Sequence, residues 1–229
     1  MDKTFCEYRD NGFMKFEDMI NKVHCADCLE FMKQIPDKSI DLIVTDPPYG
    51  FGRFKGDEKE SFMEVIKKAF IECKRVLKDG AWAFVFTGTG EIKNLLNAVC
   101  LDYQRMLWLY KPNDCTFPYR GWLLKSEAIA LFSNGKPIAL TERNPYKNDV
   151  YMDYKERSEW VSGHPTIKPK WIVEDLCLRT DGIILDPFLG SGTTAVAAKE
   201  LGRRFIGIEI SEKYCEIANR RLQQEYLQL

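Results

Sequence analysis

Two short segments of the chain carry residue types whose spacing could support chemistry. One is a glycine-rich turn, Gly190-x-Gly192-x-x-Ala195, between an apolar strand-like run and a helical pattern, with Glu209 about 20 residues further on. Glycines there let a ligand reach backbone N–H groups at a helix N-terminus, and the carboxylate can accept hydrogen bonds from ribose hydroxyls. The pattern predicts a nucleotide-type ligand. The alternative is an ordinary tight turn followed by a solvated glutamate.

The other segment is Asp46-Pro47-Pro48-Tyr49, which follows a buried apolar run. The prolines remove two N–H donors and fix the backbone, so the segment offers carboxylate and carbonyl acceptors beside an aromatic face. Such a rim suits a planar ligand with an amino group, which would stack on Tyr49. A proline-terminated strand end with a core tyrosine is the simpler alternative.

The elements that must position these segments alternate between strand and helix, which predicts an α/β fold with a largely parallel sheet. The stretches 111–124 and 136–163 lack a period and are expected to be loop or insertion. The predicted strands cover 22–25, 40–45, 81–87, 104–110, 127–132, 182–185 and 204–208. The predicted helices cover 28–35, 61–77, 91–101, 170–178, the stretch from the glycine turn to 201, and 211 to about 226.

The order of these elements is unusual for a nucleotide-binding fold. Only 20 residues follow Glu209, which is enough for one helix, so the rest of the sheet must come from upstream. This order predicts a circularly permuted α/β domain and disfavours an ordinary dehydrogenase.

These motifs together resemble the S-adenosylmethionine-dependent amino-methyltransferases of DNA, in the permuted order called the beta class. Asp46–Tyr49 is similar to their catalytic tetrapeptide. Asp186-Pro187-Phe188-Leu189-Gly190-Ser191-Gly192-Thr193-Thr194 is similar to their cofactor loop, and His164-Pro165-Thr166-Ile167-Lys168-Pro169 to the segment near the methionine end of the cofactor. The resemblance implies a Rossmann-like methyltransferase fold: a mostly parallel, seven-stranded sheet with helices on both faces.

The resemblance also implies roles for individual residues. Asp46, Pro47, Pro48 and Tyr49 would be catalytic: acceptors take the amine hydrogens of a flipped base stacked on Tyr49, with no metal. Glu209 would hold the ribose, and Lys168 the methionine carboxylate. The other cofactor-binding positions would be Asp27, Thr166, Asp186, Phe188, Gly190, Ser191, Gly192, Thr193, Thr194 and Ile210.

In this family, Asp at the first position of the tetrapeptide is associated with adenine N6 and Ser with cytosine N4. Asp46 therefore favours N6-adenine methylation of double-stranded DNA. The alternatives are N4-cytosine methylation, RNA base methylation, and a non-catalytic module that binds cofactor or nucleic acid. Glutamine methyltransferases carry similar segments in the opposite order, which disfavours protein methylation.

The composition agrees with a single domain, 1–229, that includes a small insertion. The chain is 45% hydrophobic and 29% charged with net charge −1, and it has no apolar run long enough to span a membrane. The eight cysteines lack framework spacing, so we expect a reduced, cytoplasmic protein. One Cys25-x-x-Cys28 pair beside His24 is weak support for zinc, and His164 is expected to orient its loop rather than act as a base.

Residues 111–170 hold ten basic and seven acidic residues with interleaved aromatics, a composition that suits a nucleic-acid face, although a solvated loop explains it equally well. The insertion, 136–162, is the candidate target-recognition segment. Members of the resembled family that read a defined sequence usually carry a larger region there or beyond the C-terminus, so the short insertion disfavours strict sequence specificity. A homodimer and a restriction or specificity partner remain open.

Overall fold

The computed structural model describes residues 14–48, 59–112, 116–119, 122–139, 148–154 and 168–224. They form one eight-stranded sheet, in the order β1-β10-β9-β2-β3-β7-β4-β8, and a separate two-stranded sheet, β5-β6. The strands are β1 (Lys22–Cys25), β2 (Ile40–Thr45), β3 (Leu77–Gly88), β4 (Asp102–Tyr110), β5 (Thr116–Tyr119), β6 (Trp122–Leu124), β7 (Ser126–Ser133), β8 (Val150–Met152), β9 (Ile183–Asp186) and β10 (Arg204–Glu209).

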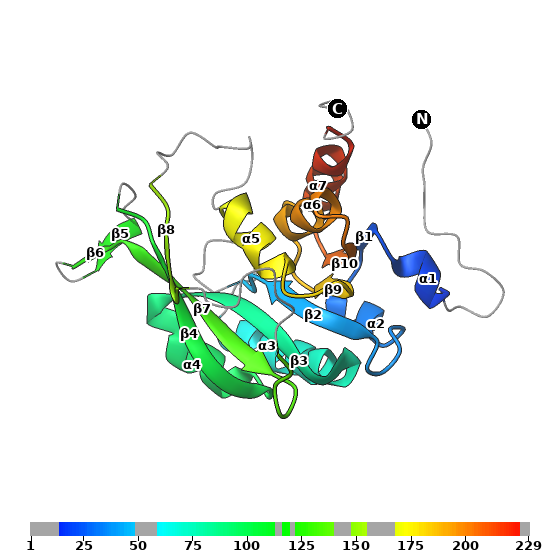
Figure 1. The fold of residues 1–229 in the computed structure, drawn as a ribbon, viewed down its shortest axis with the longest axis horizontal. Coiled ribbons are helices and arrows are strands. Elements are labelled where there is room, and N and C mark those ends of the chain that lie inside the picture. The colour runs from blue at the N-terminus through cyan, green and yellow to red at the C-terminus, as the bar shows by residue number, and fades with distance from the viewer. Residues whose placement is uncertain are drawn as a thin grey trace.

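Helices cover both faces of the large sheet (Figure 1). One layer contains α2, α3 and α4, and the opposite layer contains α5, α6 and α7. The helices are α1 (Phe16–Met19), α2 (Cys28–Met32), α3 (Lys59–Val76), the 3-10 turn η1 (Thr89–Glu91), α4 (Ile92–Ala98), α5 (Lys170–Cys177), α6 (Thr193–Glu200) and α7 (Glu212–Gln224). No helix in these described stretches is long and apolar enough to cross a bilayer.

The sheet separates two hydrophobic cores. Along β2, Ile43 packs into the core with α2 and α3, whereas Leu42 and Val44 pack into the core with α5 and α6. Successive strand residues point to opposite faces, so a strand buried on both sides is apolar at almost every position. This explains why β2 reads as a continuous apolar run.

The sheet is mostly parallel, as predicted, but has eight strands instead of seven. Five neighbouring pairs from β1 to β3 and at β4–β8 are parallel, while β7 runs antiparallel to both β3 and β4. The additional strand is β8, three residues inside the predicted insertion. Only its central residue, Tyr151, is buried, so the segment has too short an apolar pattern to be read as a strand.

Two other predictions were wrong in part. The stretch 111–124 was expected to be loop, yet β5 and β6 pair within it. A helix over 61–77 and a separate strand over 81–87 were expected, but β3 begins at Leu77, directly after α3. Gly80 has φ 73° inside β3, and the pairing of β3 with β2 shifts register at this point, so β3 is irregular around Gly80.

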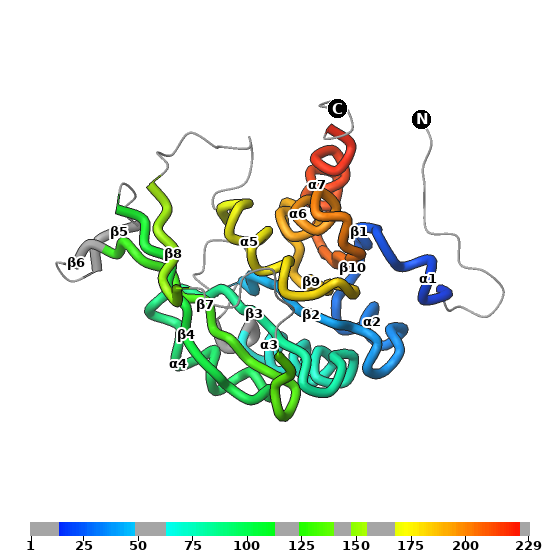
Figure 2. The backbone as a smooth tube through the Cα atoms, in the orientation of Figure 1, coloured from blue at the N-terminus to red at the C-terminus, as the bar shows by residue number. Residues whose placement is uncertain are grey.

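Segments from the two ends of the chain lie side by side in this sheet. In Figure 2 the blue β2 runs beside the yellow β9, and their parallel register joins Leu42 to Ile184. The unit β9–α6–β10 therefore comes last in the sequence but lies between β1 and β2. This is the strand order that the predicted permutation requires. A circular permutation is defined relative to the element order of other proteins, so the permutation itself stays a prediction.

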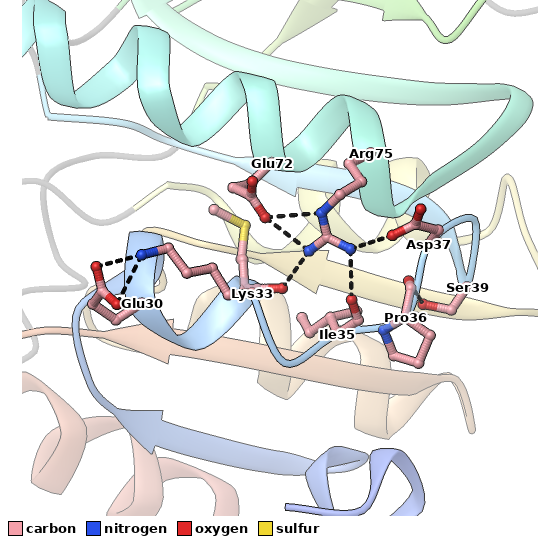
Figure 3. A network of polar contacts seen from close by, with 9 residues as sticks. Glu30, Lys33, Ile35, Pro36, Asp37, Ser39, Glu72 and Arg75 are labelled. Atoms are coloured by element: carbon pink, nitrogen blue, oxygen red, sulfur yellow. Dashed lines mark hydrogen bonds and ion pairs between the residues drawn. The ribbon is translucent and has the colours of Figure 1, made fainter. Parts of the chain in front are cut away.

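One side chain of α3 fastens the connection from α2 to β2. The Arg75 guanidinium donates to the Met32 carbonyl at 2.7 Å and to the Ile35 carbonyl at 2.9 Å, and it also contacts the Glu72 and Asp37 carboxylates (Figure 3). The carbonyls at a helix C-terminus have no partner within the helix. Arg75 supplies those donors and fixes the path of the chain into β2.

Candidate active site

The predicted site residues gather at one edge of the large sheet. Strands β1, β10, β9 and β2 are parallel, so their carboxyl ends meet there. Glu209 and Asp186 are the last residues of β10 and β9, and Asp27 and Asp46 follow β1 and β2. The antiparallel β7 brings its first residues to the same edge, where Glu127 is paired with Gly88 at the end of β3. Open α/β sheets bind ligands at this edge.

A buried hydrogen bond joins the two predicted motifs. Thr45 Oγ1, at the end of β2, donates to Asp186 Oδ1 at 2.7 Å, and the Phe188 amide donates to the same oxygen at 3.1 Å. Burial raises the pKa of Asp186 to about 7, although hydrogen bonds from Thr45, Thr194 and Phe188 oppose the shift. Asp186 therefore anchors the start of the glycine loop against the strand that carries Asp46. Thr45 was missed from the sequence.

The glycine turn has the backbone conformation that its sequence suggests. Gly192 lies at the N-terminus of α6 with φ 89°, and a Cβ there would come within 2.7 Å of the Ala218 Cβ. Both the left-handed conformation and the close contact with α7 require glycine at this position. The turn is thus held tightly between β9 and α7.

Glu209 is positioned directly beside the glycine turn. Its carboxylate accepts hydrogen bonds from the Gly190 amide and the Ser211 amide, both at 2.8 Å. The neighbouring Asp27 caps α2 by accepting from the Leu29 amide at 2.7 Å. Two carboxylates therefore lie on adjacent strand ends, an arrangement that suits hydroxyl donors. Ile210, expected beside the adenine, is 70% exposed.

The hydroxyl groups of the loop are oriented by the last helix. Arg221 of α7 donates to the Ser191 carbonyl at 2.7 Å and lies 3.2 Å from both Ser191 Oγ and Thr193 Oγ1. Ser191, Thr193 and Thr194 are buried, and Phe188 is partly buried against the core. Arg221 was not singled out from the sequence, because its target lies 30 residues earlier, with α6 and β10 between them.

A cluster of alternating charges surrounds Asp46, and we call Lys111, Glu127, Lys168 and Asp46 the four-charge cluster. The Lys168 ammonium lies 2.9 Å from Asp46 Oδ2 and 3.2 Å from Glu127 Oε2, and Glu127 Oε1 lies 2.8 Å from the Lys111 ammonium. Lys168 was expected to meet the methionine carboxylate. Its ammonium contacts two protein carboxylates.

Sequence analysis missed two members of this cluster, Glu127 and Lys111. Burial alone would raise the pKa of Glu127, but the charges and hydrogen bonds of Lys168 and Lys111 outweigh it and hold the pKa at about 2. The signal available in the sequence was one charged residue, Glu127, near the start of the otherwise apolar β7. Its partners depend on strand order and could not be read from the chain.

The remaining predicted positions are less informative. Pro47 is buried and Pro48 exposed. Tyr49, Thr166 and His164 lie outside the described residues. His24 is buried, its Nε2 lies 2.9 Å from the Met19 carbonyl, and its ring stacks on Phe31. Burial lowers the pKa of His24, which therefore behaves as a packed core histidine.

The cysteines near His24 differ from one another in exposure. Cys25 is exposed, whereas Cys28 is buried, and burial raises the pKa of the Cys28 thiol to about 12. A metal-binding cysteine must be deprotonated. Across the described ranges, no three His, Cys, Asp or Glu side chains are grouped so that they could hold a metal ion.

Comparisons with known sequences identify the family. The profile of the N6_N4_Mtase family, described as DNA methylase, matches residues 40–220. The Type II methyltransferase M.HinfI of Haemophilus influenzae is 30% identical over 255 residues, covering 90% of this chain and 69% of that protein. The DNA adenine methyltransferase YhdJ of Escherichia coli (strain K12) is 26% identical over 238 residues, covering 86% and 81%.

Solved structures share the fold. M1.HpyAVI in complex with SAM aligns with a TM-score of 0.69 at 24% identity, covering 88% of this chain and 98% of that one. The cytosine-N4-specific PvuII DNA methyltransferase aligns with a TM-score of 0.73 at 17% identity, covering 87% and 85%. The family profile includes both Asp46 and the glycine loop. The chain belongs to the N6_N4_Mtase family of DNA methylases.

Proposed function

We propose that this chain transfers a methyl group from S-adenosylmethionine to the exocyclic amine of a DNA base, adenine N6. The observation that supports this best is the position of Asp46. Its carboxylate lies at the end of β2, one residue from Thr45, whose hydroxyl is bonded to Asp186 at the start of the glycine loop. An acceptor for an amine is therefore adjacent to a candidate cofactor site.

The residues at this edge fit S-adenosylmethionine chemically. Glu209 and Asp27 offer carboxylate acceptors on adjacent strand ends for the ribose hydroxyls. The turn at Gly190 and Gly192 permits close approach to the backbone. Lys168 offers an ammonium for a carboxylate. Phe188, Ile210 and the loop hydroxyls of Ser191, Thr193 and Thr194 are the further contacts in the proposal, together with Thr166.

The reaction needs an oriented amine nitrogen and a group that stabilises the positive charge developing on it. When bound, S-adenosylmethionine supplies the methyl group: the new N–C bond forms as the methyl C–S bond breaks and the thioether leaves. Asp46 accepts an amine N–H, which aims the nitrogen lone pair and stabilises the positive charge developing on nitrogen. The same carboxylate is placed to accept the proton that the nitrogen then loses. The Pro47 carbonyl and Tyr49 ring complete the proposed base site.

Adenine is the preferred base because Asp46 is the first residue of the tetrapeptide. The adenine methyltransferase YhdJ, matched over most of this chain, agrees with that choice. Cytosine N4 is the second candidate, since the cytosine-N4-specific PvuII enzyme shares the fold. The two amines are presented in similar ways, so the product itself must decide between them.

The segment 136–162 is the proposed target-recognition insertion in a single methyltransferase domain, 1–229. Its β8 extends the sheet beside β4, close to the edge that carries the site. Within this strand pair, the side chains of Trp108 and Tyr110 in β4 and of Met152 in β8 are exposed. We place the enzyme in the cytoplasm with its double-stranded DNA substrate. The homodimer and the restriction or specificity partner stay predictions.

The test is methyl transfer from labelled S-adenosylmethionine to unmethylated genomic DNA, followed by nucleoside mass spectrometry. The wild type should produce N6-methyladenine. Asp46→Ala should lower turnover by about 10²–10³-fold or more, because it removes the acceptor that the reacting nitrogen needs. Its calorimetric affinity for S-adenosylmethionine should persist. Asp79→Ala, which removes an exposed carboxylate paired with Lys38, is the matched control and should retain turnover.

Each other outcome has a definite meaning. N4-methylcytosine would keep the mechanism and change the base. Preferential labelling of structured RNA would replace the substrate. Cofactor binding without transfer to any nucleic acid would favour a non-catalytic module. Near-normal turnover by Asp46→Ala would remove Asp46 from the mechanism.

A further inference from the structure

The four-charge cluster raises a question that the proposed chemistry does not answer. Asp46 must accept hydrogens from the base amine, yet its Oδ2 lies 2.9 Å from the Lys168 ammonium. Charge-assisted pairs of this length are among the stronger hydrogen bonds in proteins. Lys168 therefore competes with the amine for the Asp46 carboxylate.

The two partners, Lys168 and Asp46, differ in how deeply their side chains are buried. The Lys168 side chain is 9% exposed, whereas the Asp46 side chain is 28% exposed. The ammonium also lies 5.5 Å from the centre of the Phe86 ring, at the end of β3. A buried ammonium that loses its counter-ion is strongly destabilised. Asp46 turns towards a base at lower cost if another carboxylate stays beside Lys168.

Within the protein, Glu127 supplies such a carboxylate, in addition to the cofactor carboxylate that is proposed to meet Lys168. Its Oε2 lies 3.2 Å from the Lys168 ammonium, while its other oxygen is held by Lys111 at 2.8 Å. Pairing with β3 and β4 on both sides fixes the backbone of β7 at this residue. Glu127 thus has one oxygen anchored and the other aimed at Lys168, from a rigid position in the sheet.

We infer that Glu127 is a positioning residue that holds Lys168 as a second counter-ion and so releases Asp46 to bind the base amine. The inference rests on the proposed function of Asp46. The ammonium shifts its partnership from Asp46 towards Glu127 when the base enters, and the cluster stays neutral because it holds two cations and two anions. Glu127 touches neither cofactor nor base.

The first test is Glu127→Gln, which keeps the shape and removes the charge. Lys168 then has Asp46 as its remaining partner in the cluster, so turnover should fall by about 10- to 100-fold, the value of one charge-assisted hydrogen bond. The affinity for S-adenosylmethionine, measured by calorimetry, should not weaken, because the surroundings of Lys168 become less negative. Glu127→Asp should recover part of the turnover.

Lys111→Met separates positioning from a purely structural role. It leaves Glu127 next to Lys168 and removes only the anchoring cation, so turnover should fall less than in Glu127→Gln. A structural role predicts that Glu127→Gln and Lys111→Met damage melting temperature and turnover alike. If Glu127→Gln is unstable, Lys111→Met/Glu127→Gln keeps the cluster neutral and should show the same loss of turnover.

A double-mutant cycle tests whether Glu127 acts through Lys168. In a Lys168→Met background, Glu127→Gln should cost no further turnover, because the competing ammonium is gone. An undiminished 10- to 100-fold loss there would overturn the inference, as would wild-type turnover by Glu127→Gln. Absence of any methylated base with the wild-type chain would instead reject the proposed function itself.

Discussion

Asp186 and Asp46 lie at the ends of neighbouring strands, but their surroundings differ. Asp186 is 4% exposed and accepts hydrogen bonds from Thr45 and the Phe188 amide. Asp46 is partly exposed and faces Lys168. Burial favours the neutral form of the Asp186 carboxyl group. Asp186 therefore acts in the framework, and Asp46 is the proposed catalytic carboxylate.

The buried carboxyl group should make stability depend on pH. Burial raises the Asp186 pKa from 3.8 to about 7, so between these values the folded chain holds a proton that the unfolded chain has lost. The contribution of this group to stability is present below about pH 4 and is lost as pH rises towards 7, with a total of the order of a few kcal/mol.

Asp186→Asn should remove this dependence. Urea unfolding of both proteins at pH 5 and pH 7.5 isolates the effect, since titration of His24 and other groups is common to both. The variant should gain stability relative to wild type on going from pH 5 to pH 7.5. An equal difference at both pH values would show that Asp186 ionises normally.

At the scale of elements, connections between helices and strands decide where the site residues lie. Arg75 of α3 donates to the Met32 and Ile35 carbonyls and contacts Glu72 and Asp37. These contacts fix the chain between α2 and β2. Since β2 leads directly to Asp46, the position of the proposed catalytic carboxylate depends on this fastening.

Arg75→Ala should lower the free energy of unfolding by about 1–3 kcal/mol, because the Ile35 carbonyl loses its Arg75 donor and the Met32 carbonyl keeps only the Ile35 amide. The urea midpoint measures the change. Lys33→Ala is the control: its ion pair with Glu30 is exposed, and its removal should leave the midpoint unchanged. Equal effects of both substitutions would mean that the Arg75 contacts add nothing beyond surface charge.

At the scale of the whole molecule, the proposed cofactor site joins the two ends of the chain. Asp27 follows β1, Glu209 ends β10, and the glycine turn lies between β9 and α6. A ligand bound there contacts only the folded chain, so it stabilises folding by mass action. The extent of stabilisation reports whether the site is formed as proposed.

At a concentration of about 100 times its Kd, S-adenosylmethionine should add about 2.7 kcal/mol and raise the melting temperature by roughly 5–10 °C. ATP, which lacks the methionine part, should give a smaller shift. Asp46→Asn should keep the shift, because Asp46 is proposed to contact the base. Loss of the shift in Asp46→Asn would place that residue in the cofactor site instead.

Much of the fold was predictable from the sequence, because it depends on local patterns of residues. The apolar run of β2 marks a strand buried on both faces, and the residues after it, Asp46 to Pro48, had to lie at a strand end. Gly192 likewise indicated the turn before α6. The family follows from these segments and their order, and the profile match confirmed it.

Only the tertiary structure decided which polar and charged side chains meet. Thr45 and Asp186 are 141 residues apart, and they bond because β2 and β9 are neighbours in the sheet. Glu127 reaches Lys168 because β7 runs antiparallel and brings its first residues to the site edge. A sequence records side-chain types and local periods, whereas contacts across the sheet depend on strand order, which is set by long-range pairing of the whole chain.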